Sequence, residues 1–308
     1  MTAPRVSIGL PVYNGQRFIE ETITAILAQT WADLELVISD NASTDRTEAI
    51  CRAYAARDQR IRYFRNPANL GAAENYNLAF RRARGEFFKW SAHDDLIAPE
   101  FVARCLAVLE ADPGAVLCWP RTVDIDADGR QISDKQYELH ADADDPVERF
   151  AEMIGMAHTC EAIFGLIRSA VLAQTPLIAP YADSDRVLLA ELALRGRFRS
   201  LDEPMFFYRD HDERSTEVYP SRDERIAWFD PRLAGRIVFP HFRQSLEYWR
   251  TPARAGLPAR ARWRCRVRLL PWAWQNRHRL LDDLKRAARK ALRPAWRRLR
   301  ALGGRARA

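Results

Sequence analysis

The sequence lacks a long apolar run, a paired-cysteine motif and a glycine-rich phosphate loop. No stretch approaches the roughly 18 apolar residues of a membrane-spanning helix, and the N-terminus leads into a strand-like segment without the pattern of a signal peptide. The five cysteines show no metal-ligand or Cys-x-x-Cys spacing, so we expect reduced thiols in a cytoplasmic protein. The absence of Gly-x-Gly-x-x-Gly and Walker sequences argues against dehydrogenases and P-loop enzymes.

Charge is divided unevenly along the chain. Residues 254–308 contain sixteen Arg and two Lys against two Asp, whereas residues 1–253 contain 30 basic and 39 acidic residues. The net charge of +7 is therefore the sum of an acidic body and a strongly basic tail. We expect these two parts to have different tasks.

Strand and helix patterns alternate in the first half of the chain. Apolar runs predict strands at 6–10, 34–39, 61–64, 87–90 and 115–119. Helical spacing predicts helices between them, at 18–29, 43–57, 71–84 and 99–110. The alternation predicts an α/β fold with a mostly parallel central sheet flanked by helices, and ligands at the carboxyl ends of its strands.

The second half is less regular. The sequence predicts a hairpin turn at Asp128-Gly129, a polar loop at about 131–146, a helix at 185–195 and one or two strands at 198–208. Residues 251–258 are predicted to join the body to the basic tail.

Acidic residues stand at the ends of two predicted strands. Asp40 closes the second strand, and Asp94 with Asp95 follows the fourth. The carboxyl ends of neighbouring parallel strands face one crevice, and paired carboxylates on a short turn suit a divalent cation such as Mg²⁺. Acidic residues also favour turns and helix starts for structural reasons, but three at one edge favour a binding site.

Five motifs occur in an order and spacing that resemble the family 2 glycosyltransferases. They are Pro11-Val12-Tyr13-Asn14, Ser39-Asp40-Asn41-Ala42-Ser43-Thr44-Asp45, Asn69-Leu70-Gly71 with Asn75, Gly85-Glu86-Phe87-Phe88-Lys89-Trp90, and His93-Asp94-Asp95. The resemblance is strong over about residues 4–125 and looser to about 215. It implies a GT-A-like fold, a nucleotide-diphosphate-sugar donor, a divalent cation (Mg²⁺ or Mn²⁺) and inversion at the anomeric carbon.

The same resemblance assigns the donor site. It implies that Pro11, Tyr13 and Asn14 line the nucleotide pocket. It also implies that Asp40 contacts the base, usually uracil, so the expected donor is a UDP-sugar, with Asn41 and Asn75 in the same site. Asp94 would hold the ribose or the metal, and Asp95 is the residue we expect to coordinate the metal directly.

The resemblance places the catalytic base in the second half. Asp185 matches the base position, with Ser184 in place of the usual Glu; Asp183 is the rival, and a plain helix start is the structural alternative. Arg209 and His211 match an Arg-x-His element that can close over the diphosphate, although an ordinary surface loop is nearly as plausible. Two further departures from the family pattern are Ser39 and Ala92, where the family often has acids.

These expectations divide the chain into three parts. Residues 1–125 form the nucleotide-sugar-binding half, 126–250 the acceptor-side half, and 251–308 a basic amphipathic helical tail. The tail interleaves Arg with Trp263, Trp272 and Trp274, which favours an anionic membrane surface. Nucleic acid, or packing on the acidic body, is the less favoured alternative for the tail.

We therefore expect a metal-assisted inverting glycosyltransferase of cell-envelope polysaccharide biosynthesis. Its acceptor would be a saccharide or a lipid-linked saccharide at the inner face of the cytoplasmic membrane. Two other hypotheses stay open at this point: a non-catalytic nucleotide-sugar-binding module, and a nucleic-acid-associated protein acting through its tail.

Overall fold

The computed structural model describes residues 3–134, 139, 141–155 and 160–305, and the side chains of these residues up to position 292. Its strands form one sheet in the order β3-β2-β1-β4-β8-β6-β9-β5, with β7 paired to β6. The strands are β1 (Val6–Val12), β2 (Leu34–Asp40), β3 (Ile61–Arg65), β4 (Phe87–Trp90), β5 (Leu96–Ile97), β6 (Ala115–Ile125), β7 (Gln131–Ser133), β8 (Leu166–Arg168) and β9 (Arg197–Arg209).

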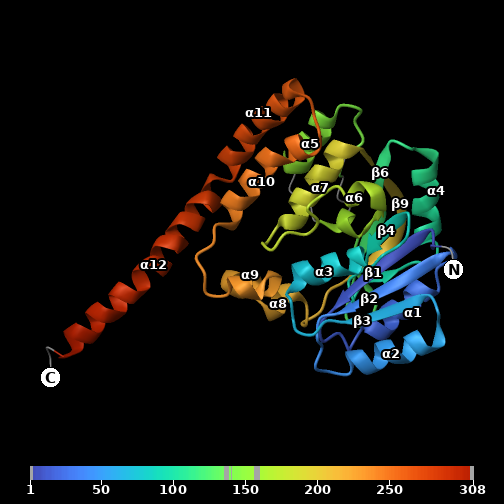
Figure 1. The fold of residues 1–308 in the computed structure, drawn as a ribbon, viewed down its shortest axis with the longest axis horizontal. Helices are drawn as coiled ribbons and strands as arrows, with labels where there is room; N and C mark the ends of the chain where they lie inside the picture. The colour runs from blue at the N-terminus through green and yellow to red at the C-terminus, as the bar shows by residue number, and fades with distance from the viewer. Residues whose placement is uncertain (1–2, 135–138, 140, 156–159, 306–308) are drawn as a thin grey trace.

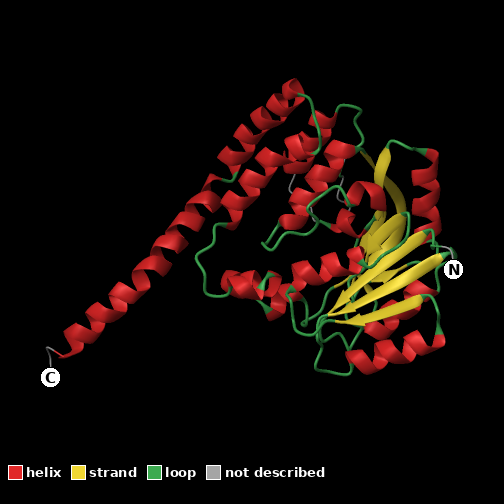
Figure 2. Ribbon diagram, viewed as in Figure 1, coloured by secondary structure: helices red, strands yellow, loops and turns green. Residues whose placement is uncertain are grey.

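Helices cover both faces of this sheet (Figure 2). Those of the body are α1 (Ile19–Leu27), α2 (Thr47–Arg57), α3 (Ala72–Arg81), α4 (Phe101–Ala111), α5 (Pro146–Gly155), α6 (Ser169–Leu172), α7 (Ser184–Arg195), α8 (Ser215–Val218) and α9 (Arg222–Phe229). Three helices follow at the C-terminal end: α10 (Pro240–Arg254), α11 (Ala259–Gln275) and α12 (Arg277–Arg305). The predicted α/β, GT-A-like class is confirmed, with the basic tail helical as expected.

The strand directions are more mixed than the sequence predicted. The run β3-β2-β1-β4 is parallel, as is the pair β6 and β9. The short strand β8 lies between β4 and β6 and is antiparallel to both, and β5 and β7 are also antiparallel to their partners. These three short strands have too few residues to give a clear period-2 pattern.

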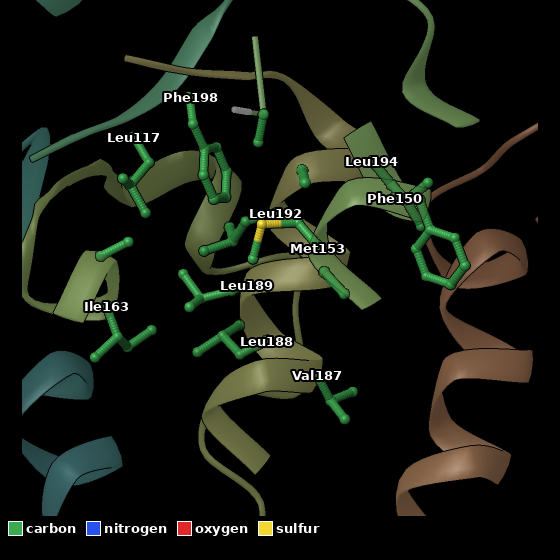
Figure 3. Close-up of a cluster of buried hydrophobic side chains, with 14 of the residues drawn as sticks. Leu117, Phe150, Met153, Ile163, Val187, Leu188, Leu189, Leu192, Leu194 and Phe198 are labelled. Atoms are coloured by element: carbon green, nitrogen blue, oxygen red, sulfur yellow. The ribbon is translucent and has the colours of Figure 1, made fainter. Parts of the chain in front are cut away.

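Two hydrophobic cores fill the space on the two sides of the sheet. One contains Ile8, Ile19 and Phe101 and packs beneath α1 and α4. The other contains Trp90 and Phe198 and packs beneath α3, α5, α7 and the C-terminal helices. Helix α7 is buried around its whole circumference from Val187 to Leu194, because α5, α10 and the sheet enclose it (Figure 3).

Several predicted boundaries differ from the structure. Helix α2 begins at Thr47, not at Ser43 or Thr44, because Ser43 Oγ accepts the backbone N–H of Asn14 and Thr44 N–H donates to the Asn14 side chain. Helix α3 ends at Arg81, and β9 is one strand that continues through Pro204 with a shift in its register to β6. Residues 135–138 and 140 of the predicted polar loop lie outside the described residues.

The basic tail is packed onto the body over its first part. Helix α10 continues through the expected joint at Thr251-Pro252 to Arg254. Helix α11 buries Cys265, Leu269 and Trp272 in the core. Figure 1 shows α12 leaving the body and extending well beyond it. No described helix is both long and apolar enough to cross a membrane.

One buried carboxylate fastens α12 to the body. Asp283 accepts the backbone N–H groups of His241 and Phe242, at 2.9 and 3.2 Å, where α10 begins. It also pairs with the Arg222 side chain from α9 and with the His241 ring. Its neighbour Asp282 pairs with Arg222 as well, but its side chain is about half exposed.

We predict that Asp283→Ala lowers the free energy of unfolding by about 3 kcal/mol, because it leaves a partly buried arginine without its main partner. Asp282→Asn is the matched control and costs under about 1 kcal/mol, since exposed ion pairs contribute little. Denaturant unfolding followed by circular dichroism measures both. Equal losses in the two variants would show that Asp283 is not the fastening point.

Candidate active site

The candidate site lies at the carboxyl edge of the sheet. Strands β1, β2 and β4 end there, and β5 pairs with β9 so that Leu96 lies opposite Phe207. This pairing brings Asp94 and Asp95, just before β5, against the residues at the end of β9. Segments more than 100 residues apart in the sequence therefore meet in one place.

Arg209, the last residue of β9, joins the surrounding segments. Its backbone N–H donates to Asp95 Oδ1 at 2.9 Å, and its Nε donates to the carbonyl of Asp94 at 2.8 Å. Its terminal nitrogens donate to the carbonyl of Ala127 and to Glu21 Oε2, both at 2.7 Å. The guanidinium is buried and lies over the Phe18 ring. Contact with a diphosphate stays a prediction for Arg209; in this structure its Nε and both terminal nitrogens donate to protein oxygens.

His211 and Asp94 form the central pair of the site. His211 Nε2 lies 3.0 Å from Asp94 Oδ2, and the Phe18 ring packs against the imidazole at 4.5 Å. Although burial opposes it, the charge of His93 and the hydrogen bond from His211 lower the pKa of Asp94. Asp94 is therefore ionised, which a carboxylate must be to hold a cation.

Asp95 has the opposite electrostatic situation. It is almost completely buried, and burial together with the charge of Asp94 raises its pKa well above the usual range. One of its oxygens is taken by the Arg209 backbone. We expected Asp95 to be the direct metal ligand, but of the two acids Asp94 has the more suitable charge and exposure.

Asp40 has hydrogen-bond partners at both carboxylate oxygens. Oδ1 accepts the Ser43 N–H at 2.8 Å, and Oδ2 accepts the Tyr63 hydroxyl at 2.6 Å and the Arg65 guanidinium at 3.0 Å. Its side chain is fully buried. In this structure Asp40 binds the backbone of the 41–46 loop and the side chains of Tyr63 and Arg65. Its contact with a nucleotide base stays a prediction.

Two asparagines from the same motifs connect the loops around the donor side. Asn41 Oδ1 accepts the Leu70 N–H at 2.9 Å, and its amide donates to Asn69 at 2.8 Å. Asn75 Oδ1 accepts the Ser39 hydroxyl at 2.7 Å, and its amide donates to the Val12 carbonyl at 3.3 Å. Both side chains are buried. Ser39, one of the departures from the family pattern, therefore serves as a hydrogen-bond donor inside this network.

The motif at the end of β1 contains one partly exposed aromatic ring, that of Tyr13. Pro11 is buried in the sheet opposite Ser39. Asn14 adopts a left-handed conformation with φ of 53°. Its side-chain Oδ1 accepts the Thr44 N–H at 2.8 Å. Tyr13 is half-buried between them and is the member of this motif best placed to contact a ligand.

The second departure, at Ala92-His93, places a histidine beside the turn that carries Asp94. A Cβ atom added to Gly15 would lie only 2.5 Å from the His93 ring, so the imidazole packs directly against this glycine. The carbonyl of His93 also accepts the Thr22 hydroxyl at 2.9 Å. His93 thus shapes the turn that carries Asp94.

Asp185 is the second residue of α7, in the second half of the chain. Burial and the neighbouring charge of Asp183 raise its pKa, which makes the carboxylate a stronger proton acceptor than an exposed aspartate. Asp183 precedes the helix in a left-handed conformation with φ of 65°, a strained geometry that often occurs at functional sites. Ser184, which replaces the usual Glu, is buried.

One tyrosine connects the two sides of this crevice. Tyr76, on α3, has its pKa raised by burial and by the negative charges of Asp94, Asp95 and Asp185. The charges of acids from the first and the second half of the chain therefore act on this one phenol.

The residues present fit a divalent cation that arrives with its substrate. A carboxylate and an imidazole, such as Asp94 and His211, are common ligands for Mn²⁺ and can hold Mg²⁺ through the oxygen donor. In this structure both ring nitrogens of His211 have partners, Nε2 with Asp94 Oδ2 and Nδ1 with the Glu213 N–H, so His211 would have to release one of them to ligate the cation. Within the described ranges, no group of three or more His, Cys, Asp or Glu is arranged to hold a metal. Substrate phosphate oxygens would therefore have to complete its coordination.

Sequence reasoning missed four residues of this site. Glu21 holds Arg209, Tyr63 and Arg65 hold Asp40, and Tyr76 faces the crevice. Tyr63 and Arg65 alternate along β3 and so share a face, and β3 is the neighbour of β2, which ends at Asp40. This period-2 pattern next to Asp40 could have indicated Tyr63 and Arg65 from the sequence. No pattern in the sequence indicates Glu21 or Tyr76.

Comparisons with known proteins place the chain in a family. The sequence model of the family described as glycosyl transferase family 2 matches residues 7–172, which is more than half of the chain. An uncharacterized glycosyltransferase, EpsJ of Bacillus subtilis, is 28% identical over 239 residues, covering 72% of this chain and 67% of EpsJ. An uncharacterized glycosyltransferase of Rickettsia typhi is 35% identical over 107 residues, and the match spans only 32% of its length and 35% of this chain.

Solved structures show the same fold. TarS residues 1–349 of S. aureus, in complex with UDP-GlcNAc, superposes with a TM-score of 0.65 at 16% identity, covering 93% of this chain and 81% of TarS 1–349. The mannosyltransferase PcManGT of Pyrobaculum calidifontis, in complex with GDP-Man and Mn²⁺, gives a TM-score of 0.51 at 18% identity, covering 98% and 81%. These likenesses show the GT-A-like fold, and the family match over residues 7–172 establishes that the chain belongs to glycosyltransferase family 2.

Proposed function

We propose that this glycosyltransferase transfers a sugar from a nucleoside diphosphate, with inversion and with the help of a divalent cation. The observation that carries the proposal is the Asp94–His211 pair, an ionised carboxylate and an imidazole in a crevice that also faces Asp185. Neighbours of the same fold bind UDP-GlcNAc and GDP-Man, which supports a nucleotide-sugar donor. We propose a UDP-sugar.

The donor would lie along the carboxyl edge of the sheet. Tyr13 and the loop that Asp40 holds would border the nucleotide, and the diphosphate would reach Asp94 and His211. A bound Mg²⁺ or Mn²⁺ would neutralise the charge that develops on the departing diphosphate. The neighbour in complex with Mn²⁺ supports a cation at this position.

Asp185 would act as the general base. In an inverting transfer the base removes a proton from the acceptor hydroxyl on the face of the sugar opposite the leaving group. The raised pKa of Asp185 favours that task, because a carboxylate with a higher proton affinity is the stronger base. Arg209 would hold Asp94 and His211 in the same relative positions while the charge on the diphosphate changes.

The C-terminal helices would place the enzyme on an anionic membrane surface. On α11, Trp263, Val267, Leu270 and Trp274 recur at helical spacing, and all four are exposed, three of them by at least 65%. Arginines occupy neighbouring positions, with Arg277 stacked on Trp274. Exposed tryptophans with arginines are typical of the bilayer interface. Trp272, which we had grouped with them, faces the core.

This surface supports a saccharide acceptor that is lipid-linked, at the inner face of the cytoplasmic membrane. Large exposed apolar faces are uncommon on proteins that work free in solution. The cysteines are all unpaired thiols, which is the usual state in a reducing compartment. The tail's basic charge also suits nucleic acid, but the unbroken apolar stripe along α11 favours the lipid surface.

We predict that Asp94→Asn and His211→Ala each weaken UDP binding in the presence of Mn²⁺ by at least about 10-fold, as loss of one metal ligand would. Asp95→Asn should weaken it much less, because the amide oxygen can still accept the Arg209 N–H. Isothermal titration measures the affinities, with His278→Ala, an exposed histidine on α12, as the control. If Asp95→Asn weakens UDP binding more than Asp94→Asn does, Asp95 and not Asp94 is the metal ligand.

We predict that Asp185→Asn lowers the rate of transfer by about 10²- to 10⁴-fold and leaves donor binding unchanged. Release of nucleoside diphosphate with added acceptor measures the rate. Asp183→Asn is the matched control, since Asn tolerates the left-handed conformation. Near-normal turnover in Asp185→Asn would exclude this base.

The pH dependence of transfer provides a separate test of the same assignment. Asp185 acts only as the carboxylate, so the rate falls as the pH drops through its raised pKa. Asp183→Asn removes a negative charge and lowers that pKa, so the acid limb of the pH–rate profile should move to lower pH. An acid limb that stays in place, or moves upward, would contradict the assignment.

We predict that replacing Trp263, Leu270 and Trp274 together with Ser lowers binding to phosphatidylglycerol vesicles at least about 10-fold, because several large apolar side chains would no longer be buried in the bilayer. Vesicle flotation measures the bound fraction. Ile132→Ser, at an exposed apolar position on β7, is the control. Equal flotation of the native protein and the triple variant would exclude α11 as the membrane surface.

A further inference from the structure

Exposed apolar side chains are concentrated on the C-terminal helices. Among the described residues, twelve of the fifteen large apolar side chains that are exposed lie between Ile237 and Leu292, and the other three are Leu70, Ile132 and Val218. Single exposed apolar residues are ordinary, but a contiguous group of them marks an interaction surface. The surface therefore extends beyond the one helix, α11, that we assigned to the membrane.

Helix α10 has an apolar stripe of its own. Phe239, just before the helix, and Phe242, Leu246 and Trp249 within it recur at helical spacing, and each of the four is 39% to 46% exposed. The opposite face of α10 is packed onto the body, with Tyr248 almost completely buried. The α10 stripe therefore points away from the body.

Arg266 joins the stripe of α10 to the stripe of α11. It lies on α11, and its guanidinium carbon is 4.4 Å from the centroid of the Trp249 ring on α10. It follows Trp263 by three residues and precedes Leu270 by four, so it neighbours both of these exposed side chains on the helix surface. Figure 1 shows α10 and α11 side by side, and the two helices are in contact. The two stripes therefore belong to one surface.

The Arg266 guanidinium has no hydrogen-bond acceptor within the described part of the chain. Its Nε is buried and unpartnered, whereas Arg264, two residues earlier, pairs with Asp145 at 2.6 Å. A guanidinium withdrawn from water without an acceptor is costly. Because its planar set of N–H donors matches the oxygens of a phosphate group, a phosphate is the ligand that this side chain suits best.

The charge around this surface identifies the kind of partner. Residues 254–308 contain sixteen Arg and two Lys against two Asp, and both of these acids, Asp282 and Asp283, are already paired with Arg222. A second copy of the chain would bring the same positive charge against this face, which like-charge repulsion opposes. An anionic lipid surface supplies both the apolar medium and the opposite charge.

We propose that α10 and α11 bind an anionic bilayer together, and that Arg266, stacked on Trp249, binds the phosphate of a lipid headgroup between the two helices. Phe242 and Leu246 would enter the bilayer beside the α11 stripe. The inference rests on the proposed function, because it extends the membrane surface assigned there to α11 and adds a headgroup site to it.

The first test is Arg266→Lys, which keeps the positive charge but removes the planar set of donors. Arg268→Lys is the matched control, since Arg268 is an exposed arginine on the same helix. Flotation with phosphatidylglycerol vesicles measures the affinity. We expect Arg266→Lys to weaken binding by about 3- to 10-fold, the effect of hydrogen bonds to a charged group. Arg268→Lys should stay within about 2-fold, because its charge is unchanged.

The second test removes the α10 stripe. Phe242→Ser combined with Leu246→Ser should lower binding to the same vesicles at least about 10-fold, because two large apolar side chains would no longer enter the bilayer. Val218→Ser, at an exposed apolar position on α8, is the control. The melting temperatures should not change, since all three side chains are exposed. Unchanged flotation of the double variant would exclude α10 from the membrane surface.

The remaining outcomes separate this inference from the proposed function. If Arg266→Lys and Arg268→Lys weaken binding equally, or neither does, Arg266 binds no headgroup and the inference is wrong, while the membrane surface on α11 stands. Inorganic phosphate should not displace the protein from the vesicles at an ionic strength matched with sodium chloride; displacement would show a site for a free anion and overturn the lipid assignment. If the native protein does not float with the vesicles, the proposed membrane surface fails and this inference fails with it.

Discussion

The candidate site depends on one buried cation. Arg209 at the end of β9 is hydrogen-bonded to Asp94, to Asp95, to the turn at Ala127 and to Glu21 on α1. A buried guanidinium is costly unless its donors are satisfied, so these contacts fix the relative positions of four segments. Two residues further on, the same strand end delivers His211 to Asp94. The Thr22 hydroxyl, which reaches the carbonyls of His93 and Asp95, and the pairing of β5 with β9 reinforce the same arrangement.

This arrangement also separates two adjacent carboxylates into different roles. Asp94 has its pKa lowered by His93 and His211, whereas burial and the charge of Asp94 raise the pKa of Asp95. Two like charges on neighbouring residues ionise together only at a cost. We propose that Asp94 binds the cation, whereas Asp95 accepts the backbone N–H of Arg209. One of the two neighbouring carboxylates thus takes part in the chemistry, and the other holds the end of β9 in place.

The sequence predicted much of the fold but less of the site. Elements such as β1, β2, α1 and α7 were predicted within a few residues, because each carries a run or a helical spacing of apolar residues long enough to mark a buried strand or helix. The short antiparallel strands β5 and β8 carry no such pattern, and they decide which loops meet. Motif order indicated Asp94, Asp185 and His211, but it gave no way to see that Arg209 is buried. That distinction depends on which partners surround a guanidinium, and these come from three separate segments.

We propose above all that Arg209 positions Asp94 and His211, and that these two side chains are the protein ligands of a metal ion that also binds the diphosphate. Crystals of the protein grown with UDP and Mn²⁺, with diffraction recorded at the manganese absorption edge, test it most directly. The account predicts one anomalous peak bonded to Asp94, His211 and phosphate oxygens. A peak held by Asp95 or by other side chains, with His211 still paired to Asp94, would contradict it.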